Sequence, residues 1–240
     1  MKTYLPTCII LLLFSACNTD CIQGSGNQVT QERQVEPFTS VDVSGSIKLV
    51  LQQDSVQQLL ITADDNIQEH IKTRVKGGKL TVELNNICDA GPVKVYAKAK
   101  TFTGVSGSGA VEISSADRIN AEDFSLDLSG SSKVSLDISA ANVTTNASGS
   151  SEITLTGQAA SHRIGLSGSG RVNAFDFVVA DYSIEASGSS KMYINVLNSL
   201  DVNTSGSSDI EYRGNPQHVN NKQSGAGSLK RADAAPSNSL

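Results

Sequence analysis

Apolar and polar residues alternate along most of the chain, in short segments that meet at a recurring Ser-Gly-Ser unit. Aligned on the first glycine of each unit, the repeats fall at Gly107, Gly130, Gly149, Gly168, Gly188 and Gly206, spaced by 23, 19, 19, 20 and 18 residues. A period near 20 residues is typical of stacked repeats. Alternation on both sides of the glycine predicts two short strands per repeat, each with one face turned inward.

Residues of one kind recur at each position of the repeat. Four residues after the glycine all side chains are apolar, namely Val111, Val134, Ile153, Val172, Met192 and Ile210. Stacking the repeats in parallel would bury this column and join strands about 4.8 Å apart. The pattern therefore predicts an all-β fold, a parallel β-helix or solenoid with about 19–20 residues in each rung. A Gly corner suits such a fold because glycine adopts positive φ without strain.

Charges mostly alternate in sign at the position three residues after the glycine, which is occupied by Lys133, Glu152, Arg171, Lys191 and Asp209. Opposite charges on neighbouring strands stabilise a sheet by about 0.2–1 kcal/mol per pair. Arg171 beside Lys191 is the one exception to this alternation, and the β-helix pattern does not explain it.

Residues 36–105 are predicted to form the irregular first rungs of the same solenoid. The gap of 62 residues between Gly45 and Gly107 corresponds to about three rungs that lack the motif. Strands are expected over 38–53, 58–62, 79–84 and 93–97, with turns at Asp64-Asp65-Asn66 and Gly77-Gly78 and a short helix or loop over 67–76. The polar segment 221–240 is expected to be a C-terminal tail.

The amino-acid composition argues against several classes of function. Of the 240 residues only 38% are apolar, Trp is absent and the net charge is −5. An acidic chain without a basic face is not expected to bind nucleic acid. Three histidines make a multi-histidine metal site improbable, and the Gly-x-Gly units lack the strand–helix context of a nucleotide loop, so no metal or cofactor is predicted.

The first residues predict export and a lipid anchor. Lys2 precedes an apolar run over 5–14 that is too short to span a bilayer, so residues 1–16 are expected to be a signal peptide. Ser15-Ala16 before Cys17 resembles a bacterial lipobox, in which Cys17 would be lipidated and attach the chain to a membrane. The alternative is ordinary cleavage near Ala16 that leaves Cys17 as a thiol. Residues 17–35 then form an N-terminal arm, which leads to a β-helix domain over 36–220.

Two cysteines, Cys21 and Cys88, remain outside the signal and the lipidation site. Export to an oxidising compartment favours a disulfide between them over two free thiols. Such a bond would attach the N-terminal arm to the body of the protein.

The start Cys21-Ile22-Gln23-Gly24, the strand over 41–46 and the serial Ser-Gly-Ser-Ser units resemble the putative auto-transporter adhesin head GIN domain, a domain of unknown function found mainly in Bacteroidota lipoproteins. The resemblance covers residues 36–220. It implies a right-handed, single-stranded β-helix in the cell envelope, with the outer membrane as the expected location and no established ligand.

Two classes of function stay open. One is a non-catalytic adhesin or binding module for a glycan or protein, and the other is a polysaccharide lyase or hydrolase on a β-helix. Catalysis needs acids and bases gathered on one outward face, whereas Asp137, Arg163, Glu185, Asp201 and Arg213 fall in different columns. Binding is the preferred prediction, and the outward patch to test consists of Phe175, Tyr193, Asn195 and Arg213. The alternative is that both rings cover a neighbouring loop.

Overall fold

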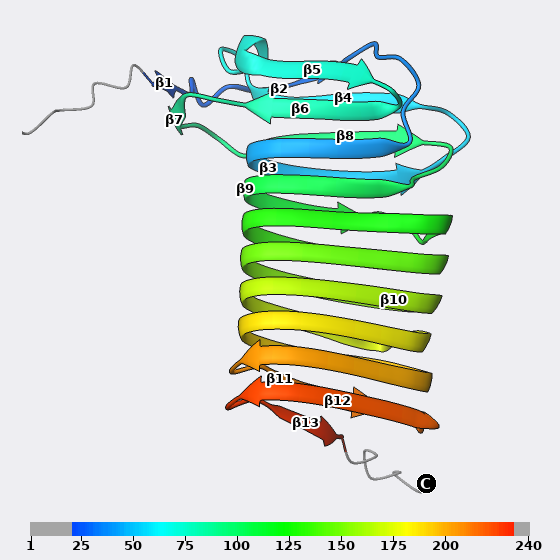
Figure 1. Ribbon diagram of the computed structural model, residues 1–240. Helices are drawn as coiled ribbons and strands as arrows, with labels where there is room; N and C mark the ends of the chain where they lie inside the picture. Colours follow the sequence, from blue (N-terminus) through cyan, green and yellow to red (C-terminus); the bar gives the residue numbers. More distant parts are fainter. Residues whose placement is uncertain (1–20, 233–240) are drawn as a thin grey trace, which may run out of the picture.

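The computed structural model describes residues 21–232, and most of them lie in β-strands (Figure 1). The signal segment and Cys17 lie outside the described residues, as does 233–240. The elements are β1 (Ile22–Gln23), β2 (Gln28–Glu32), β3 (Ser40–Gln53), β4 (Gln58–Asp64), the 3-10 turn η1 (Gln68–His70), β5 (Ile71–Lys76), β6 (Lys79–Leu84), β7 (Ile87–Asp89), β8 (Val93–Ala99), β9 (Gly104–Ser115), β10 (Ile119–Gly206), β11 (Asp209–Arg213), β12 (His218–Gly225) and β13 (Ser228–Arg231). The all-β class predicted from the alternation is confirmed. In this part of the chain no helix is long and apolar enough to cross a membrane.

The second half of the chain is a stack of parallel strand pairs. β9 pairs with the start of β10, the end of β10 pairs with β11 and β12, and β11 pairs with β13, in each case in parallel. Figure 1 shows the chain returning on successive levels, with β10 passing through several of them. β10, with 88 residues, is therefore a series of strands bent at corners. β12 and β13 carry the pairing to Arg231, so the polar segment 221–231 adds strands to the sheet.

One glycine per level forms a corner, and these glycines lie one above another. They all have positive φ and are called the glycine column below: Gly45, Gly109, Gly130, Gly149, Gly168, Gly188, Gly206 and Gly225. From Gly109 onward, a Cβ atom on each would lie within 2.8 Å of the carbonyl oxygen of the preceding glycine. Glycine alone satisfies both the backbone angle and this close approach. Gly109, and not Gly107, belongs to the column, so the first repeat is shifted by two residues from the predicted alignment.

Inward side chains of successive levels form the core. Val134, Ile153 and Val172, which share one position of the repeat, are each no more than 1% exposed. Burying a side chain of this size contributes about 1.5–3 kcal/mol. A polar column also lies inside, where the Ser190 hydroxyl donates to the Ser208 oxygen at 2.9 Å. The interior is thus filled by like residues from neighbouring levels.

The segment between Gly45 and Gly109 is an insertion and not a run of further levels. β3 pairs directly with β9, in a register that sets these two glycines opposite each other. On its other side β3 pairs in parallel with β6 and β8. Beyond them β4 pairs antiparallel with β8, β5 with β6, and β2 with β4. The prediction of about three parallel rungs here is wrong, because the sheet is mixed.

A two-residue turn explains the antiparallel return at β5 and β6. Gly77 and Gly78 have φ angles of 59° and 75°, which is the backbone geometry of a tight hairpin. Such a turn sends the chain straight back beside itself, so residues 71–76 form β5. The helix or loop predicted over 67–76 is therefore limited to η1, and the remainder is strand.

The N-terminal arm is fastened to this mixed region. Cys21 and Cys88 form a disulfide with their Cα atoms 5.4 Å apart, which agrees with the pairing expected from the sequence. The buried Asp64 carboxylate accepts hydrogen bonds from Gln28 Nε2 at 3.1 Å and from the Gly91 amide at 3.2 Å. These bonds, led by the one from Gln28, hold the pKa of Asp64 below its usual value. The arm is thus held by one covalent and several polar contacts.

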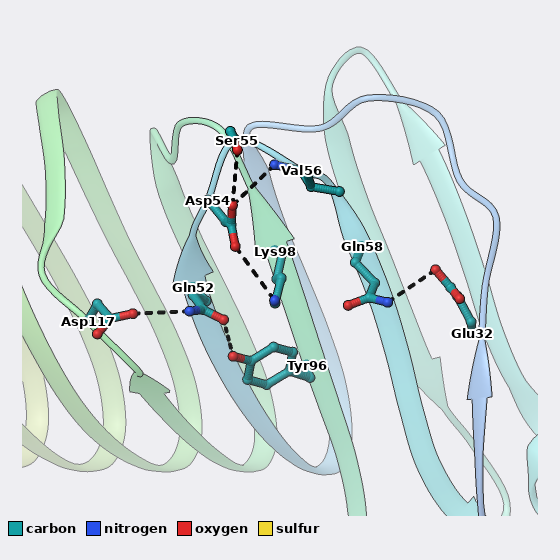
Figure 2. A network of polar contacts seen from close by, with 9 residues as sticks. All are labelled: Glu32, Gln52, Asp54, Ser55, Val56, Gln58, Tyr96, Lys98 and Asp117. Atoms are coloured by element: carbon teal, nitrogen blue, oxygen red, sulfur yellow. Dashed lines mark hydrogen bonds and ion pairs between the residues drawn. The ribbon is translucent and has the colours of Figure 1, made fainter.

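Polar side chains also connect the insertion to the parallel stack at the end of β3. Gln52 accepts a hydrogen bond from the Tyr96 hydroxyl in β8 and donates one of 3.1 Å to Asp117, which lies between β9 and β10 (Figure 2). Beside it, the Asp54 carboxylate lies 3.6 Å from Lys98 Nζ. β3 is therefore the strand on which the two parts of the sheet meet.

Candidate binding face

Side chains on one outward side of the parallel stack form a continuous surface, called the outer face below. It consists of the third, fifth and seventh residues after the column glycine, which on four successive levels are Glu152, Thr154 and Thr156; Arg171, Asn173 and Phe175; Lys191, Tyr193 and Asn195; and Asp209, Glu211 and Arg213. The residues between them, such as Met192 and Ile194, are buried. The register pairs Tyr193 with Glu211 and Asn195 with Arg213. Alternation and stacking thus bring distant residues into one grid.

The four residues singled out from the sequence lie together on this face. The rings of Phe175 and Tyr193 meet edge to face with centroids 5.3 Å apart. Arg213 Cζ lies 3.9 Å from the centroid of Phe175, and Asn195 Nδ2 donates to the Phe175 carbonyl at 3.1 Å. Arg213 therefore stacks on the Phe175 ring.

A hollow of about 330 Å³ opens beside the two rings. Its lining combines aromatic edges with short polar side chains: Thr154, Leu155, Thr156, Asn173, Phe175, Asp176 and Tyr193. Ligand sites are commonly hollows of about 300–1,000 Å³ in which a few polar groups fix the orientation of the ligand. The two rings thus border a surface hollow.

A groove of about 820 Å³ runs along the stack next to this hollow, across the charged column from Lys48 to Asp209. In this column Lys48 Nζ lies 2.7 Å from a Glu112 carboxylate oxygen. Among residues 21–232 no carboxylate oxygen lies within 4.0 Å of the charged groups of Arg171 or Lys191. The groove therefore carries two adjacent cations that make no close ion pair, although Glu152 and Asp209 are their next neighbours in the column.

Lys191 connects the groove to the aromatic pair. Its Nζ lies 5.6 Å from the centroid of the Tyr193 ring. Contact with Tyr193 raises the pKa of Lys191, while the like charge of Arg171 acts in the opposite direction. Lys191 is therefore fully protonated at neutral pH and presents its charge beside an aromatic surface.

A second groove, of about 790 Å³, lies on the other side of the glycine column. The outward residues there are mainly serines with a few acids, such as Asp127 and Glu185. Asn146 Nδ2 donates to the Asp127 carboxylate at 2.9 Å, so this acid is engaged with its neighbour on the next level. This groove offers hydroxyl groups but no aromatic side chain.

Two of the acids considered for the catalytic alternative, Asp137 and Asp201, each bind a different neighbour. Asp137 pairs with Arg118 at 2.8 Å, and Asp201 accepts from Asn220 at 2.7 Å. In the described range no three His, Cys, Asp or Glu side chains are grouped as metal ligands. These acids are therefore engaged at separate places on the stack.

His162 is buried among apolar and aromatic side chains. It is 1% exposed, its Nε2 lies 2.9 Å from the Thr145 hydroxyl, and its ring centroid lies 5.2 Å from that of Tyr182. Burial lowers the pKa of His162 to about 3. The imidazole is thus neutral in the folded protein and belongs to the core.

Stacked levels that join their outward residues into one surface define a class of repetitive all-β proteins. The chain belongs to the family described as "Putative auto-transporter adhesin, head GIN domain", which matches residues 37–216. This is the family that the Ser-Gly-Ser repeats resemble. Among curated proteins, none matches the chain significantly.

Solved structures share the fold. A putative adhesin from Bacteroides fragilis NCTC 9343 is 19% identical, with a TM-score of 0.83 over 88% of this chain and 100% of that one. A putative adhesin from Parabacteroides merdae ATCC 43184 is 19% identical, with a TM-score of 0.68 over 89% and 100%. A putative lipid binding protein from Parabacteroides distasonis ATCC 8503 is 22% identical, with a TM-score of 0.67 over 88% and 99%. At these identities the likeness concerns the fold.

The sequence predicted that Phe175 and Tyr193 lie together, but it did not predict that Arg171 and Lys191 lie next to them. The signal was present, because these two residues break the alternation of charge in their column. The groove that contains them could not be inferred, since its shape depends on how the levels stack.

Proposed function

We propose that the chain is a non-catalytic binding module of the cell envelope that recognises an extended glycan through its outer face. We further propose that β3 and residues 104–231 form a right-handed, single-stranded parallel β-helix, into which the mixed region between β3 and β9 is inserted. The family described as an adhesin head domain and the parallel pairing of β9 to β13 support this assignment. Stacked repeats suit long ligands because each level repeats the same surface.

The hollow beside Phe175 and Tyr193 is the observation that carries the proposal. The apolar C–H face of a sugar packs against an aromatic ring, and its hydroxyls need nearby polar groups. Tyr193 supplies the ring surface, Asn173 and Thr154 supply an amide and a hydroxyl, and Phe175 borders the hollow. Arg213 and Asn195 hold Phe175 in place. Of the four predicted residues, Phe175 and Tyr193 would thus touch the ligand, Arg213 would position the Phe175 ring, and Asn195 would hold the backbone of Phe175.

We propose a binding role in preference to the alternative of a polysaccharide lyase or hydrolase. A glycosidase needs two carboxyl groups about 5–10 Å apart across one bond. Asp176, the acid at the hollow, is the one carboxylate among the residues that line it. The lining therefore favours recognition of a sugar over cleavage.

The location follows from the same proposal. Lipidation of Cys17 would anchor the chain in a membrane, most simply the outer membrane, a few residues before the arm held by the Cys21–Cys88 disulfide. Metabolic labelling with a palmitate analogue tests the anchor. Label should enter the wild type and be lost in Cys17→Ala, whereas label retained in that variant would contradict lipidation at this cysteine.

A glycan array tests the proposed ligand class. The purified protein should bind a subset of glycans, and combined Phe175→Ala and Tyr193→Ala substitutions should weaken binding about tenfold or more, because each ring contributes about 0.5–1.5 kcal/mol beyond its buried area. Leu197→Ala is the matched control, since Leu197 is an apolar side chain on the same level that is 51% exposed. Undiminished binding by the double variant, or no glycan bound by the wild type, would contradict the proposal.

A further inference from the structure

Arg171 and Lys191 occupy equivalent positions on neighbouring levels, three residues after Gly168 and Gly188. Like charges directly opposite each other destabilise a sheet. Elsewhere in this column opposite charges are neighbours, as in the register of Lys191 with Asp209. The Arg171–Lys191 pair is therefore an arrangement that folding alone does not favour.

The surroundings of this pair are those of a ligand site. Both residues line the groove of about 820 Å³ together with serine hydroxyls from the corners of the same levels. Asn173 and Tyr193, two residues further along the same strands, line the adjoining hollow. Lys191 Nζ is 5.6 Å from the Tyr193 centroid, so one cation lies where groove and hollow meet.

We propose that Arg171 and Lys191 bind the carboxylate of a hexuronic acid unit of an acidic polysaccharide, with its sugar ring against Tyr193. This inference rests on the proposed glycan-binding function and specifies the class of glycan. An arginine guanidinium presents paired donors that match the two oxygens of a carboxylate, and a lysine ammonium adds a point charge. A carboxylate between them would also relieve their mutual repulsion.

The chemistry favours an acidic sugar over an acidic peptide. A sugar ring that carries a carboxylate would engage the cation pair and the tyrosine at once, and its hydroxyls would meet Ser169 and Ser189 in the groove. A polyanion without rings would use the cations alone. The protein has a net charge of −5, so recognition must come from this local pair and not from long-range attraction.

Binding to polygalacturonate and to the same polymer with its carboxyl groups reduced to alcohols tests the inference. The acidic polymer should bind at least about tenfold more tightly, and Arg171→Gln and Lys191→Gln should each weaken its binding about tenfold, as expected for the loss of a hydrogen bond to a charged group. Lys133→Gln is the matched control. It removes one cation from the same column and groove, but Lys133 has an acid on each neighbouring level, Glu112 and Glu152, and no adjacent cation. This variant should stay within about twofold of the wild type, since exposed, offset charges contribute little.

The outcomes separate this inference from the proposed function. Equal binding of both polymers, lost only when Tyr193 is replaced by Ala, would leave glycan binding intact and overturn the carboxylate assignment. Poly-glutamate bound as tightly as polygalacturonate, or equal losses in Lys133→Gln and Arg171→Gln, would also overturn it. Failure of every glycan to bind would refute the proposed function and the inference with it.

Discussion

Residues 104–231 and residues 21–103 pair their strands in two different ways, although all of these strands except β1 and β7 share one sheet. In the first region every strand pair between elements is parallel, and one glycine recurs at the corner of each level. In the second region three of the pairs are antiparallel, a Gly-Gly turn reverses the chain, and a disulfide holds the arm. Parallel stacking requires a repeated sequence, whereas antiparallel pairing can be made by local turns.

The two regions also differ in what they expose. The repeating region presents the outer face, with columns of side chains at fixed spacing and a groove along them. The mixed region directs its polar side chains to one another, as Figure 2 shows for Gln52, Tyr96 and Asp117. Repetition therefore produces a surface available to a ligand, and the insertion covers one end of the stack.

The largest expected effect comes from adding a methyl group to the glycine column. Gly168→Ala should destabilise the protein by roughly 4 kcal/mol or prevent folding, because of its φ of 107° and the backbone oxygen of Gly149 at 2.5 Å from the new Cβ. Gly77→Ala in the other region should cost only about 1 kcal/mol, since φ is 59° and nothing lies within 4 Å. Urea denaturation measures both. Equal costs would contradict the distinction between stacked and local turns.

Removal of the disulfide should affect one region only. Cys88→Ala opens a link between residues 67 positions apart in sequence, which typically costs about 3 kcal/mol. Hydrogen exchange followed by mass spectrometry should show faster exchange in β1, β2 and β7 and unchanged protection in the β10 levels. Faster exchange throughout β10 would show that the stack depends on the arm.

Acid should weaken the parallel stack through His162. The unfolded chain takes up a proton below pH 6.5, but the folded chain does so only near pH 3, so stability falls as the pH is lowered through this window. Between pH 7 and pH 5 the loss should be about 2 kcal/mol. His162→Phe should remove this dependence, and the exposed His218→Gln should keep it. A pH dependence that survives in His162→Phe would contradict the assignment to His162.

The smallest effect concerns the charged column. Lys48→Met breaks the ion pair with Glu112, whose groups are about half exposed, so the free energy of unfolding should change by less than about 1 kcal/mol. Thermal unfolding in low and high salt checks this expectation. A larger loss of stability would mean that the main role of the charged column is to stabilise the fold. This result would weaken the assignment of the column to ligand binding.

The strands of the repeating region and their parallel pairing could be predicted because the same sequence pattern recurs at every level. Alternating residues and a corner glycine recur, so columns such as Val134, Ile153 and Val172 can be aligned by inspection. The alignment failed by two residues at the first unit because Ser-Gly-Ser-Gly offers two glycines, and only the stacking of Gly109 on Gly45 distinguishes them.

The mixed region could not be predicted as well, because its pairing is between segments with no common pattern. Strand positions such as 79–84 were correct, but nothing local shows that β3 pairs with β9 and that the chain between them is inserted. The candidate site, too, could be predicted only in part. Phe175 and Tyr193 could be placed together from their spacing, whereas the stacking of Arg213 on Phe175 depends on a long side chain crossing a level.

Hydroxyl-radical footprinting with and without polygalacturonate tests most directly whether the outer face is where this protein binds. Bound polymer should protect Tyr193 and Phe175 from oxidation and leave Val56, Leu197 and Val219, which are 67%, 51% and 45% exposed, as reactive as before. Protection confined to residues of the second groove or the N-terminal region, with Tyr193 unchanged, would contradict the account.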